Sequence, residues 1–453
     1  MISTSPINID QLSSVAVLGY GVTGESVVRF LLDRKINVSV YDTRAPREVD
    51  NCPVEIHWQT SRWPNAAEQG RPVDCAIVSP GLDMDACLLQ SARAAGVRLY
   101  SDIDLFFAAV AVPVIGITGT NGKSTVTSLV GHLINTVGHT CGVGGNLGVA
   151  ALDIIDSEHD CYVLELSSFQ LERSLLHPYA ASTVLNLSED HLDKHTDMQA
   201  YAASKHRIYV NSDTRVFNRA DPLTLPHTDG RAVSFGLDEP PGPDDWGIRL
   251  SADERFIAKG EEIICPVSQL PLAGEHNEQN VLAACALTQG WVDLNRLTQA
   301  LSSFQGLAHR FEQVAEVGGV DFINDSKATN LGATMAALAG MSADKQVVLI
   351  AGGDAKGVDL APLSALLESR VHHLVALGQD GPQLMQLADS VGVAATLVAS
   401  MEEAVDVSHR VARQGNTVLL SPACASLDMF VSYADRGEQF VRAVRKLETA
   451  GAI

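Results

Sequence analysis

Short apolar runs rich in Val, Ile and Leu alternate along the chain with longer segments whose apolar residues recur at helical spacing. Each run ends in glycine or polar residues, the pattern of a buried parallel strand followed by a turn and a helix. Strands are expected at residues 15–18, 38–41, 75–78, 97–100, 114–117, 162–166, 183–187, 215–217, 321–324, 347–351, 374–377, 396–398 and 418–420. Helices are expected at residues 126–133, 201–209 and 278–288, with another ending near residue 32.

The alternation falls into three blocks, which predict an α/β protein of three domains with parallel sheets. We place these domains at residues 1–101, 102–306 and 307–453. The first and third have the pattern of Rossmann-like domains, and the central one that of a P-loop mononucleotide-binding domain. Residues 236–272, rich in Pro, Gly and Asp, break the rhythm and predict either loops or a small antiparallel addition.

The central block opens with a glycine-rich loop, Gly119–Thr125, between the apolar run 114–117 and the amphipathic segment 126–133. Backbone N–H groups of such a loop point at an anion, and the helix N-terminus adds partial positive charge. Lys123 would reach the outer phosphates, and the Ser124 hydroxyl would bind magnesium. The first glycine of the usual motif is replaced by Ile117, and an ordinary β–α turn is the alternative. We predict a nucleoside triphosphate site.

Two further groups in this block follow predicted strands, where open α/β sheets bind ligands. Glu165 closes one apolar run, and Asp190-His191 lies just beyond another. An acidic residue beside a phosphate loop is what magnesium needs, because hard cations prefer oxygen ligands. A solvated strand end for Glu165 and a surface histidine for His191 are the alternatives.

The first block carries a second glycine motif, Gly19-Tyr20-Gly21-Val22-Thr23-Gly24, after a strand. Asp42 follows about 20 residues later at the end of the next strand, which is the pattern of a nicotinamide dinucleotide site. In the third block, the segments 324–330, 352–356 and 421–426 each follow a strand and should meet at one sheet edge. Their small residues, amides and two lysines suit a small carboxylated substrate, although each alone could be a β–α turn.

The composition excludes several classes of protein. With 46% apolar residues among 453, the chain can bury several cores. A net charge of −22 argues against nucleic acid or an anionic membrane surface as partners, because these need clustered Lys and Arg. The eight cysteines form no zinc spacing, no signal peptide is expected, and the longest apolar run, 105–117, is too short to span a bilayer. We expect a cytoplasmic monomer that acts on small molecules.

Together these segments resemble the Mur ligase family, the ATP-dependent enzymes that add amino acids to the peptidoglycan precursor. The resemblance covers nearly the whole chain. Its motifs are the loop Gly119–Ser124, residues 189–193, Ala-Ser-Lys-His-Arg around Lys205, and the segments 276–280, 309–312 and 324–330. Residues 164–172 and 421–428 are similar to the D-glutamate-adding branch of the family, and the Asp-Asn-Pro-Arg motif of the diaminopimelate-adding branch is absent.

The resemblance implies a ligase of cell-wall biogenesis that joins D-glutamate to UDP-N-acetylmuramoyl-L-alanine through an acyl phosphate and a tetrahedral intermediate. ATP-binding residues implied by it are Gly119, Thr120, Asn121, Gly122, Lys123, Ser124, Thr125, Asn277, Asn280, Arg310 and Asp325. The UDP-sugar substrate would contact Val22, Thr23, Asp42, Thr43, Arg44, Ser79, Gly81, Asn146, Gln170 and His191. D-Glutamate would contact Thr329, Lys356, Ser426, Leu427 and Tyr433.

The same resemblance implies Lys123, His191, Lys205 and Lys327 as catalytic residues. It also implies two Mg²⁺ ions, one near Ser124 and Glu165 and one near His191 and Lys205. A free lysine is cationic and would repel magnesium. In the family the lysine that matches Lys205 carries CO₂ as a carbamate, which reverses its charge and supplies oxygen ligands.

Three alternatives remain open from the sequence. The first glycine motif suggests a nicotinamide-dependent oxidoreductase. The phosphate loop alone suits a non-catalytic ATP-binding protein. Another amino-acid ligase of the same family, such as a folylpolyglutamate synthase, would share most of the motifs.

Overall fold

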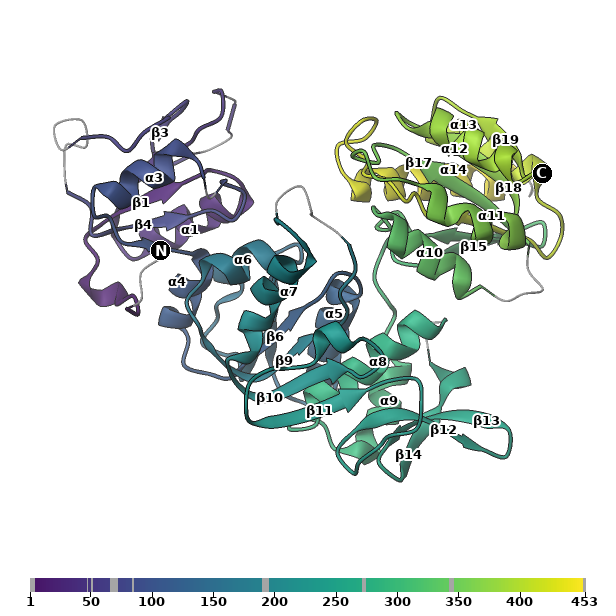
Figure 1. Ribbon diagram of the computed structural model, residues 1–453, viewed down its shortest axis with the longest axis horizontal. Coiled ribbons are helices and arrows are strands. Elements are labelled where there is room, and N and C mark those ends of the chain that lie inside the picture. Colours follow the sequence, from purple (N-terminus) through teal and green to yellow (C-terminus); the bar gives the residue numbers. More distant parts are fainter. Residues whose placement is uncertain are drawn as a thin grey trace. The chain divides into compact units, whose positions relative to one another are not determined.

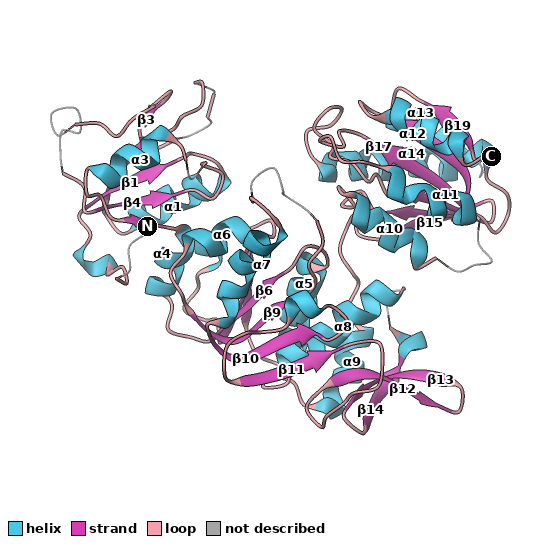
Figure 2. Cartoon of the chain, in the orientation of Figure 1, coloured by secondary structure: helices cyan, strands magenta, loops and turns pink. Residues whose placement is uncertain are grey.

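The computed structural model describes residues 5–46, 48–49, 52–65, 72–83, 85–189, 195–270, 274–341 and 346–450. It divides into two compact units, one formed by Met1–Gln269 with Gln279–Ser303 and the other by Leu270–Glu278 with Phe304–Ile453. The first unit holds two sheets and the second holds one, each covered by helices (Figures 1 and 2). Among the described residues, no helix is both long enough and apolar enough to cross a membrane.

The first sheet is parallel, with the strand order β3-β2-β1-β4-β5. Its strand order reverses at β1, and open α/β sheets bind ligands at such a point. Gly24 lies one helical turn into α1, and a Cβ there would come within 2.1 Å of the Gly19 carbonyl oxygen, so only glycine lets the helix pack this closely. The elements are β1 (Ser14–Leu18), α1 (Val22–Asp33), β2 (Asn37–Tyr41), β3 (Ile56–His57), β4 (Cys75–Val78), α3 (Cys87–Ala94), β5 (Leu99–Tyr100) and α4 (Asp102–Ala109).

The second sheet has the order β14-β13-β12-β11-β10-β9-β6-β8-β7 and is parallel from β7 to β12. Its far edge is the antiparallel extension β12-β13-β14 within residues 236–272, so the antiparallel alternative predicted there is confirmed. The strands are β6 (Val114–Thr118), β7 (Cys141–Gly145), β8 (Cys161–Glu165), β9 (Pro178–Val184), β10 (Asn211–Asn218), β11 (Arg231–Phe235), β12 (Trp246–Ser251), β13 (Glu254–Lys259) and β14 (Glu262–Pro266). The helices are α5 (Lys123–Thr136), α6 (Ser168–Arg173), α7 (Met198–His206), α8 (Glu275–Thr288) and α9 (Leu294–Ser302).

The sheet of the second unit has the order β15-β16-β20-β17-β18-β19 and is parallel except for the β15–β16 pair. Its strands are β15 (Glu312–Val317), β16 (Val320–Asn324), β17 (Val347–Gly352), β18 (Val371–Leu377), β19 (Ala394–Leu397) and β20 (Thr417–Leu420). Its helices are α10 (Leu331–Ala339), α11 (Ser364–Arg370), α12 (Gly381–Ser390), α13 (Met401–Val411) and α14 (Tyr433–Ala450). The predicted α/β class is confirmed.

Three details of the sequence prediction need correction. The strand expected at 183–187 is β9, which ends at Val184, because Asn186 hydrogen-bonds the glycine loop after β6 instead of continuing the strand. The strand expected at 97–100 is shortened to β5. The strands β3, β7, β11 and β15 were not predicted, because β3 has two residues, β7 consists largely of glycine, and β11 and β15 are partly exposed, so none forms a long apolar run.

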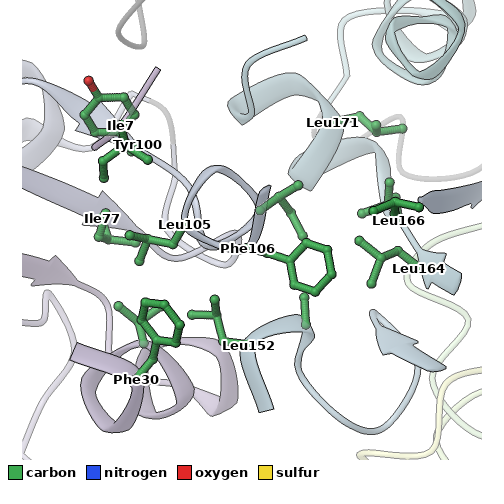
Figure 3. Packing of buried hydrophobic residues seen from close by; sticks show 14 of the residues in the cluster. Ile7, Phe30, Ile77, Tyr100, Leu105, Phe106, Leu152, Leu164, Leu166 and Leu171 are labelled. Carbon is green, nitrogen blue, oxygen red and sulfur yellow. The ribbon is translucent and has the colours of Figure 1, made fainter. Parts of the chain in front are cut away.

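The apolar core of the first unit runs continuously from the first sheet to the second. Helix α4 lies between them, with Leu105 directed toward Ile77 of β4 and Phe106 directed toward Leu164 of β8 (Figure 3). Leu171 of α6 belongs to the same cluster. This shared core fixes the loops at the ends of β4 and β8 in one body, which matters for the sites described next.

Candidate functional site

The central glycine loop is held in a conformation that requires glycine. Gly122 is the residue before α5 and has φ +81°, and a Cβ there would lie 2.3 Å from Asn280 Oδ1 of α8. Gly119 has φ +149°, and a Cβ there would lie 3.0 Å from the Leu185 side chain. The loop therefore closes tightly against its neighbours, and Asn280, predicted to bind ATP, lies directly beside it.

Asn186 fastens the loop and was missed by the sequence analysis. Its Oδ1 accepts a hydrogen bond from the Asn121 N–H at 2.8 Å, its Nδ2 donates to the Asn121 carbonyl at 3.0 Å, and its own carbonyl accepts from the Thr120 N–H. An asparagine two residues after a strand gives no signal of this role, because its partners lie 65 residues away in sequence.

The polar side chains of the loop meet a buried carboxylate. Ser124 Oγ donates to Glu165 Oε2 at 2.5 Å, and Asn146 Nδ2 donates to Glu165 Oε1 at 3.0 Å. Glu165 is only 2% exposed and ends β8, the neighbour of β6. Lys123 Nζ folds back onto the carbonyl oxygens of Gly119 and Thr120, at 3.0 and 2.7 Å. Lys123, Ser124 and Glu165 are thus brought together as the sequence predicts, whereas the contact of Asn146, predicted to bind the UDP-sugar, with Glu165 was not predicted.

Lys205 of α7 contacts the same loop and is buried. It is 2% exposed, donates to the Gly119 carbonyl at 2.9 Å and to Thr118 Oγ1 at 3.3 Å, and lies 4.7 Å from the centre of the Tyr201 ring. Lys123 and Lys205 therefore donate to the same carbonyl oxygen. Two ammonium groups this close repel each other, and burial strengthens that repulsion. His191, predicted beside Lys205, lies outside the described residues.

The N-terminal loop has a different chemistry. The buried Asp42 carboxylate accepts from the N–H groups of Tyr20 and Arg44, at 2.7 and 2.9 Å, and from Arg44 Nε and Nη2, at 2.9 and 2.6 Å. Burial acts to raise the pKa of Asp42, but the hydrogen bonds from Arg44 and the two amides outweigh it and hold the pKa at about 2. This carboxylate joins the loops after β1 and β2 and has little capacity left for ribose hydroxyls, which a nicotinamide site requires.

The other predicted UDP-sugar residues gather at the same edge. Ser79 and Gly81 follow β4, Thr43 follows β2, and Val22 (70% exposed) and Thr23 begin α1. Asn146 and Gln170 belong to the central block. The Gln170 amide is fixed in direction, because its Oε1 accepts from the N–H and hydroxyl of Ser167 at 3.1 Å and its Nε2 reaches Asp102 Oδ2 at 3.5 Å.

Three loops of the second unit are joined, as the sequence predicts. The loop with Lys356 pairs with the loop with Ser426 through an antiparallel bridge between Asp354 and Ala425. Lys327 Nζ lies 3.9 Å from the centre of the Tyr433 ring at the start of α14. Leu427, 75% exposed, and Thr329 lie on two of these loops, whereas Arg310 precedes β15.

Asp325 follows β16 and is partly buried. Its carboxylate accepts from Ser421 Oγ at 2.9 Å and from the Phe311 N–H at 3.3 Å. Burial raises the pKa of Asp325 to about 7, against the smaller opposing effect of these hydrogen bonds. Lys356 has φ +54° and Ala423 has φ +60°, so two loops of this edge hold non-glycine residues in the left-handed region, a strain that is common at ligand sites.

Arg436 of α14, also missed by the sequence analysis, ties the three loops together. It is fully buried and donates to Ser326 Oγ and O at 3.0 and 2.8 Å, to the Cys424 carbonyl at 3.2 Å and to the Gly352 carbonyl at 3.5 Å. Burial lowers the pKa of Arg436 to about 10. A signal was present, because Arg436 lies at helical spacing from the fully buried Phe440 and Val444.

Known protein families match the chain over three consecutive stretches. These are the Mur ligase MurD-like N-terminal domain at residues 13–101, the Mur ligase middle domain at 117–288 and the Mur ligase glutamate ligase domain at 309–424. The UDP-N-acetylmuramoylalanine--D-glutamate ligase of Legionella pneumophila (strain Paris) is 41% identical over 444 residues, covering 95% of this chain and 98% of that protein. The enzyme of that name from Haemophilus influenzae (strain 86-028NP) is 39% identical over 439 residues, covering 96% and 98%.

Solved structures share the fold. The UDP-N-acetylmuramate-alanine ligase of Thermotoga maritima gives a TM-score of 0.63 at 19% identity, covering 97% of this chain and 100% of that one. The MurF ligase of Thermotoga maritima in complex with ADP gives a TM-score of 0.58 at 15% identity, covering 98% and 97%. The predicted three-domain architecture is confirmed, and residues 13–101 match a Mur ligase domain, which removes the argument for a nicotinamide site. Because relatives at 41% and 39% identity cover nearly the whole chain and three Mur ligase domains match it, the chain belongs to the Mur ligase family of ATP-dependent ligases.

Proposed function

We propose that this protein joins D-glutamate to UDP-N-acetylmuramoyl-L-alanine in peptidoglycan precursor synthesis. The γ-phosphoryl group of ATP passes to the L-alanine carboxylate, giving an acyl phosphate and ADP. The amine of D-glutamate then attacks the acyl carbon, a tetrahedral intermediate forms, and inorganic phosphate leaves as the amide forms and the amine loses its proton. Activation is needed because a free carboxylate is a poor electrophile.

One observation carries the proposal: Lys123, Ser124, Glu165 and Lys205 lie together around the glycine loop. Phosphoryl transfer brings two anions together, and preorganised cations are the main means of stabilising its transition state. Lys123 supplies a fixed positive charge on this loop. The relatives that carry the name of the D-glutamate-adding ligase support the choice of substrates.

The residues at the loop suit a Mg²⁺ ion. The Ser124 hydroxyl and the Glu165 carboxylate already touch, so one hard cation can take both oxygens as ligands. Among the described residues, no group of three or more His, Cys, Asp or Glu is placed to hold a metal, so phosphate oxygens and water would complete the shell. When bound, Mg²⁺ would neutralise charge between the ATP phosphates and the attacking carboxylate.

A second Mg²⁺ is proposed near His191 and Lys205, with Lys205 as a carbamate. The neutral amine attacks the carbon of CO₂ and loses its proton, which turns a positive group into a negative one. The ammonium form of Lys205 does not suit a cation, and CO₂ reacts with the neutral amine. Solid-state carbon-13 spectra of enzyme equilibrated with labelled CO₂ should show a carbamate signal that Lys205→Ala lacks. A bare ammonium in active, substrate-bound enzyme contradicts this part of the proposal.

The remaining assignments follow the same proposal. Residues 1–101 would hold the UDP-sugar, residues 102–306 would hold ATP, and residues 307–453 would hold D-glutamate, in a cytoplasmic enzyme that acts as a monomer. Lys327 would serve the reacting groups as a cation, and Thr329, Lys356, Ser426, Leu427 and Tyr433 would bind D-glutamate. Arg310 and Asp325 would contact the nucleotide together with Asn277 and Asn280.

Phosphate release measured with ATP, Mg²⁺ and UDP-N-acetylmuramoyl-L-alanine tests the proposal directly. We expect release to depend on D-glutamate and on each of the other components. Equal release with L-glutamate or glycine would contradict the stereospecific assignment. Phosphate release with a folate in place of the UDP-sugar, and with glutamate as the added amino acid, would instead favour a folylpolyglutamate synthase.

A further inference from the structure

Arg173, the last residue of α6, is an unusual buried cation. It is 5% exposed, and its Nη1 donates to the carbonyl oxygen of Ser79, 94 residues away in sequence, at 2.8 Å. Its Nε is buried and has no hydrogen-bond partner among the described residues. Burial lowers the pKa of Arg173, partly offset by the carboxylates of Glu172, Asp83 and Asp102, none of which is within ion-pair distance in the described part of the chain.

Such a side chain is costly for the fold. A buried guanidinium without a contacting carboxylate loses hydration that a single carbonyl does not replace. An apolar side chain of similar size would fill the same space at lower cost. What the arginine adds is a direct link between two segments, the loop after β4 and the end of α6.

Both of those segments carry residues of the proposed UDP-sugar site. The loop after β4 contains Ser79 and Gly81, and α6 contains Gln170 one turn before Arg173. Gln170 uses both acceptor positions of its amide oxygen on Ser167 and one N–H on Asp102, which leaves its other N–H for a ligand. Asp102 is fully buried, and its Oδ1 has no partner in the described structure.

Helix α6, which carries Arg173, is anchored in the apolar core. Leu171 of α6 belongs to the apolar cluster that packs both sheets of the first unit against α4 (Figure 3). Arg173 therefore holds the Ser79 loop from a fixed position, and within the described part of the chain no other hydrogen bond joins this loop to α6.

We propose that Arg173 is a positioning residue for the UDP-sugar substrate, which it serves by fastening the Ser79–Gly81 loop to the helix that carries Gln170. This inference rests on the proposed function, since it takes the UDP-sugar as the ligand of that edge. Arg173 is not expected to touch the reacting atoms. Its loss should weaken substrate binding and leave the ATP loop, which lies on other strands, undisturbed.

The test compares KM and kcat of full-length Arg173→Met with wild type. We expect the KM for UDP-N-acetylmuramoyl-L-alanine to rise about tenfold, as for a lost hydrogen bond to a charged group, with kcat and the KM for ATP within about twofold. Arg173→Lys keeps one cationic donor on a similar stem and should recover part of the affinity. Calorimetric binding of UDP-N-acetylmuramoyl-L-alanine should follow the same order.

The matched control is Arg29→Met. Arg29 of α1 also bridges the first and central blocks, through an ion pair with Asp153 at 2.8 Å, but it touches neither substrate loop. We expect its KM values to match wild type.

The inference is overturned if Arg173→Met leaves the UDP-sugar KM within twofold, raises both KM values equally, or behaves like Arg29→Met. Failure of the wild-type enzyme to use the UDP-sugar would overturn the proposed function instead. If Arg173→Met does not fold, Arg173→Lys decides by the same criteria.

Discussion

The chain places a glycine-rich loop after the first strand of two different sheets, at Gly19–Gly24 and at Gly119–Ser124. Both loops lead into a helix, α1 or α5, with a glycine immediately before it. Both therefore offer backbone N–H groups and a helix N-terminus to an anion. Their side chains differ. The central loop carries Lys123 and Ser124 against a buried Glu165, whereas the N-terminal loop carries the exposed Val22 and lies beside Asp42, whose charge is paired with Arg44.

Backbone geometry therefore identifies a phosphate loop but not its ligand. A transferring phosphoryl group needs a fixed cation and oxygen ligands for magnesium, which only the central loop provides. A diphosphate that is merely held needs no ligands for magnesium. The same glycine-rich signal thus predicts diphosphate binding in the first block and phosphoryl transfer in the central block.

The largest expected effect comes from removing the cation that distinguishes the loops. Lys123→Ala should lower kcat about a thousandfold, because a preorganised charge on the transferring phosphoryl group is lost. Steady-state phosphate release measures this, with Lys35→Ala on the surface of the first block as the control. Turnover like that of wild type would remove the assignment of this loop to ATP.

A smaller effect separates the two glycines that precede the helices. Gly122→Ala forces a Cβ to 2.3 Å from Asn280 at φ +81°, so it should cost about 1–3 kcal/mol of stability and weaken ATP binding. Gly21→Ala meets no atom within 4 Å and has φ −98°, so it should change stability by less than about 0.5 kcal/mol. Denaturant unfolding of the two variants gives both values. Equal losses would show that the loops are not constrained differently.

The smallest expected effect concerns Asp42. Its pKa is about 2 in the folded protein and about 3.9 in an unfolded chain. Its contribution is therefore complete above about pH 4 and is lost as the pH falls toward 2. Asp42→Asn should cost about 1 kcal/mol at pH 7, because Arg44 is half exposed and solvent screens the pair. Melting curves of variant and wild type should converge as the pH falls from 4 to 2, and a constant gap would contradict this account.

The features that could be predicted from the sequence are those that depend on a pattern of neighbouring residues. The central loop could be recognised because a strand, glycines, Lys123, Ser124 and a helix follow one another. Glu165 could be placed because it ends an apolar run. The contacts of Asn186, Arg173 and Arg436 could not be predicted, because their partners are backbone carbonyls or amides distant in sequence. A buried arginine that binds backbone carbonyls has no acidic partner, so no acidic residue in the sequence indicates where the arginine lies.

The most direct test of the central claim is calorimetric binding of two ligands, a non-hydrolysable ATP analogue and UDP-N-acetylmuramoyl-L-alanine, to Lys123→Ala and Arg44→Ala. The account predicts that Lys123→Ala weakens the ATP analogue about tenfold or more and leaves the UDP-sugar unchanged, and that Arg44→Ala does the reverse. If either variant weakens both ligands equally, or only the ligand assigned to the other loop, the two glycine loops do not hold the two nucleotides assigned to them.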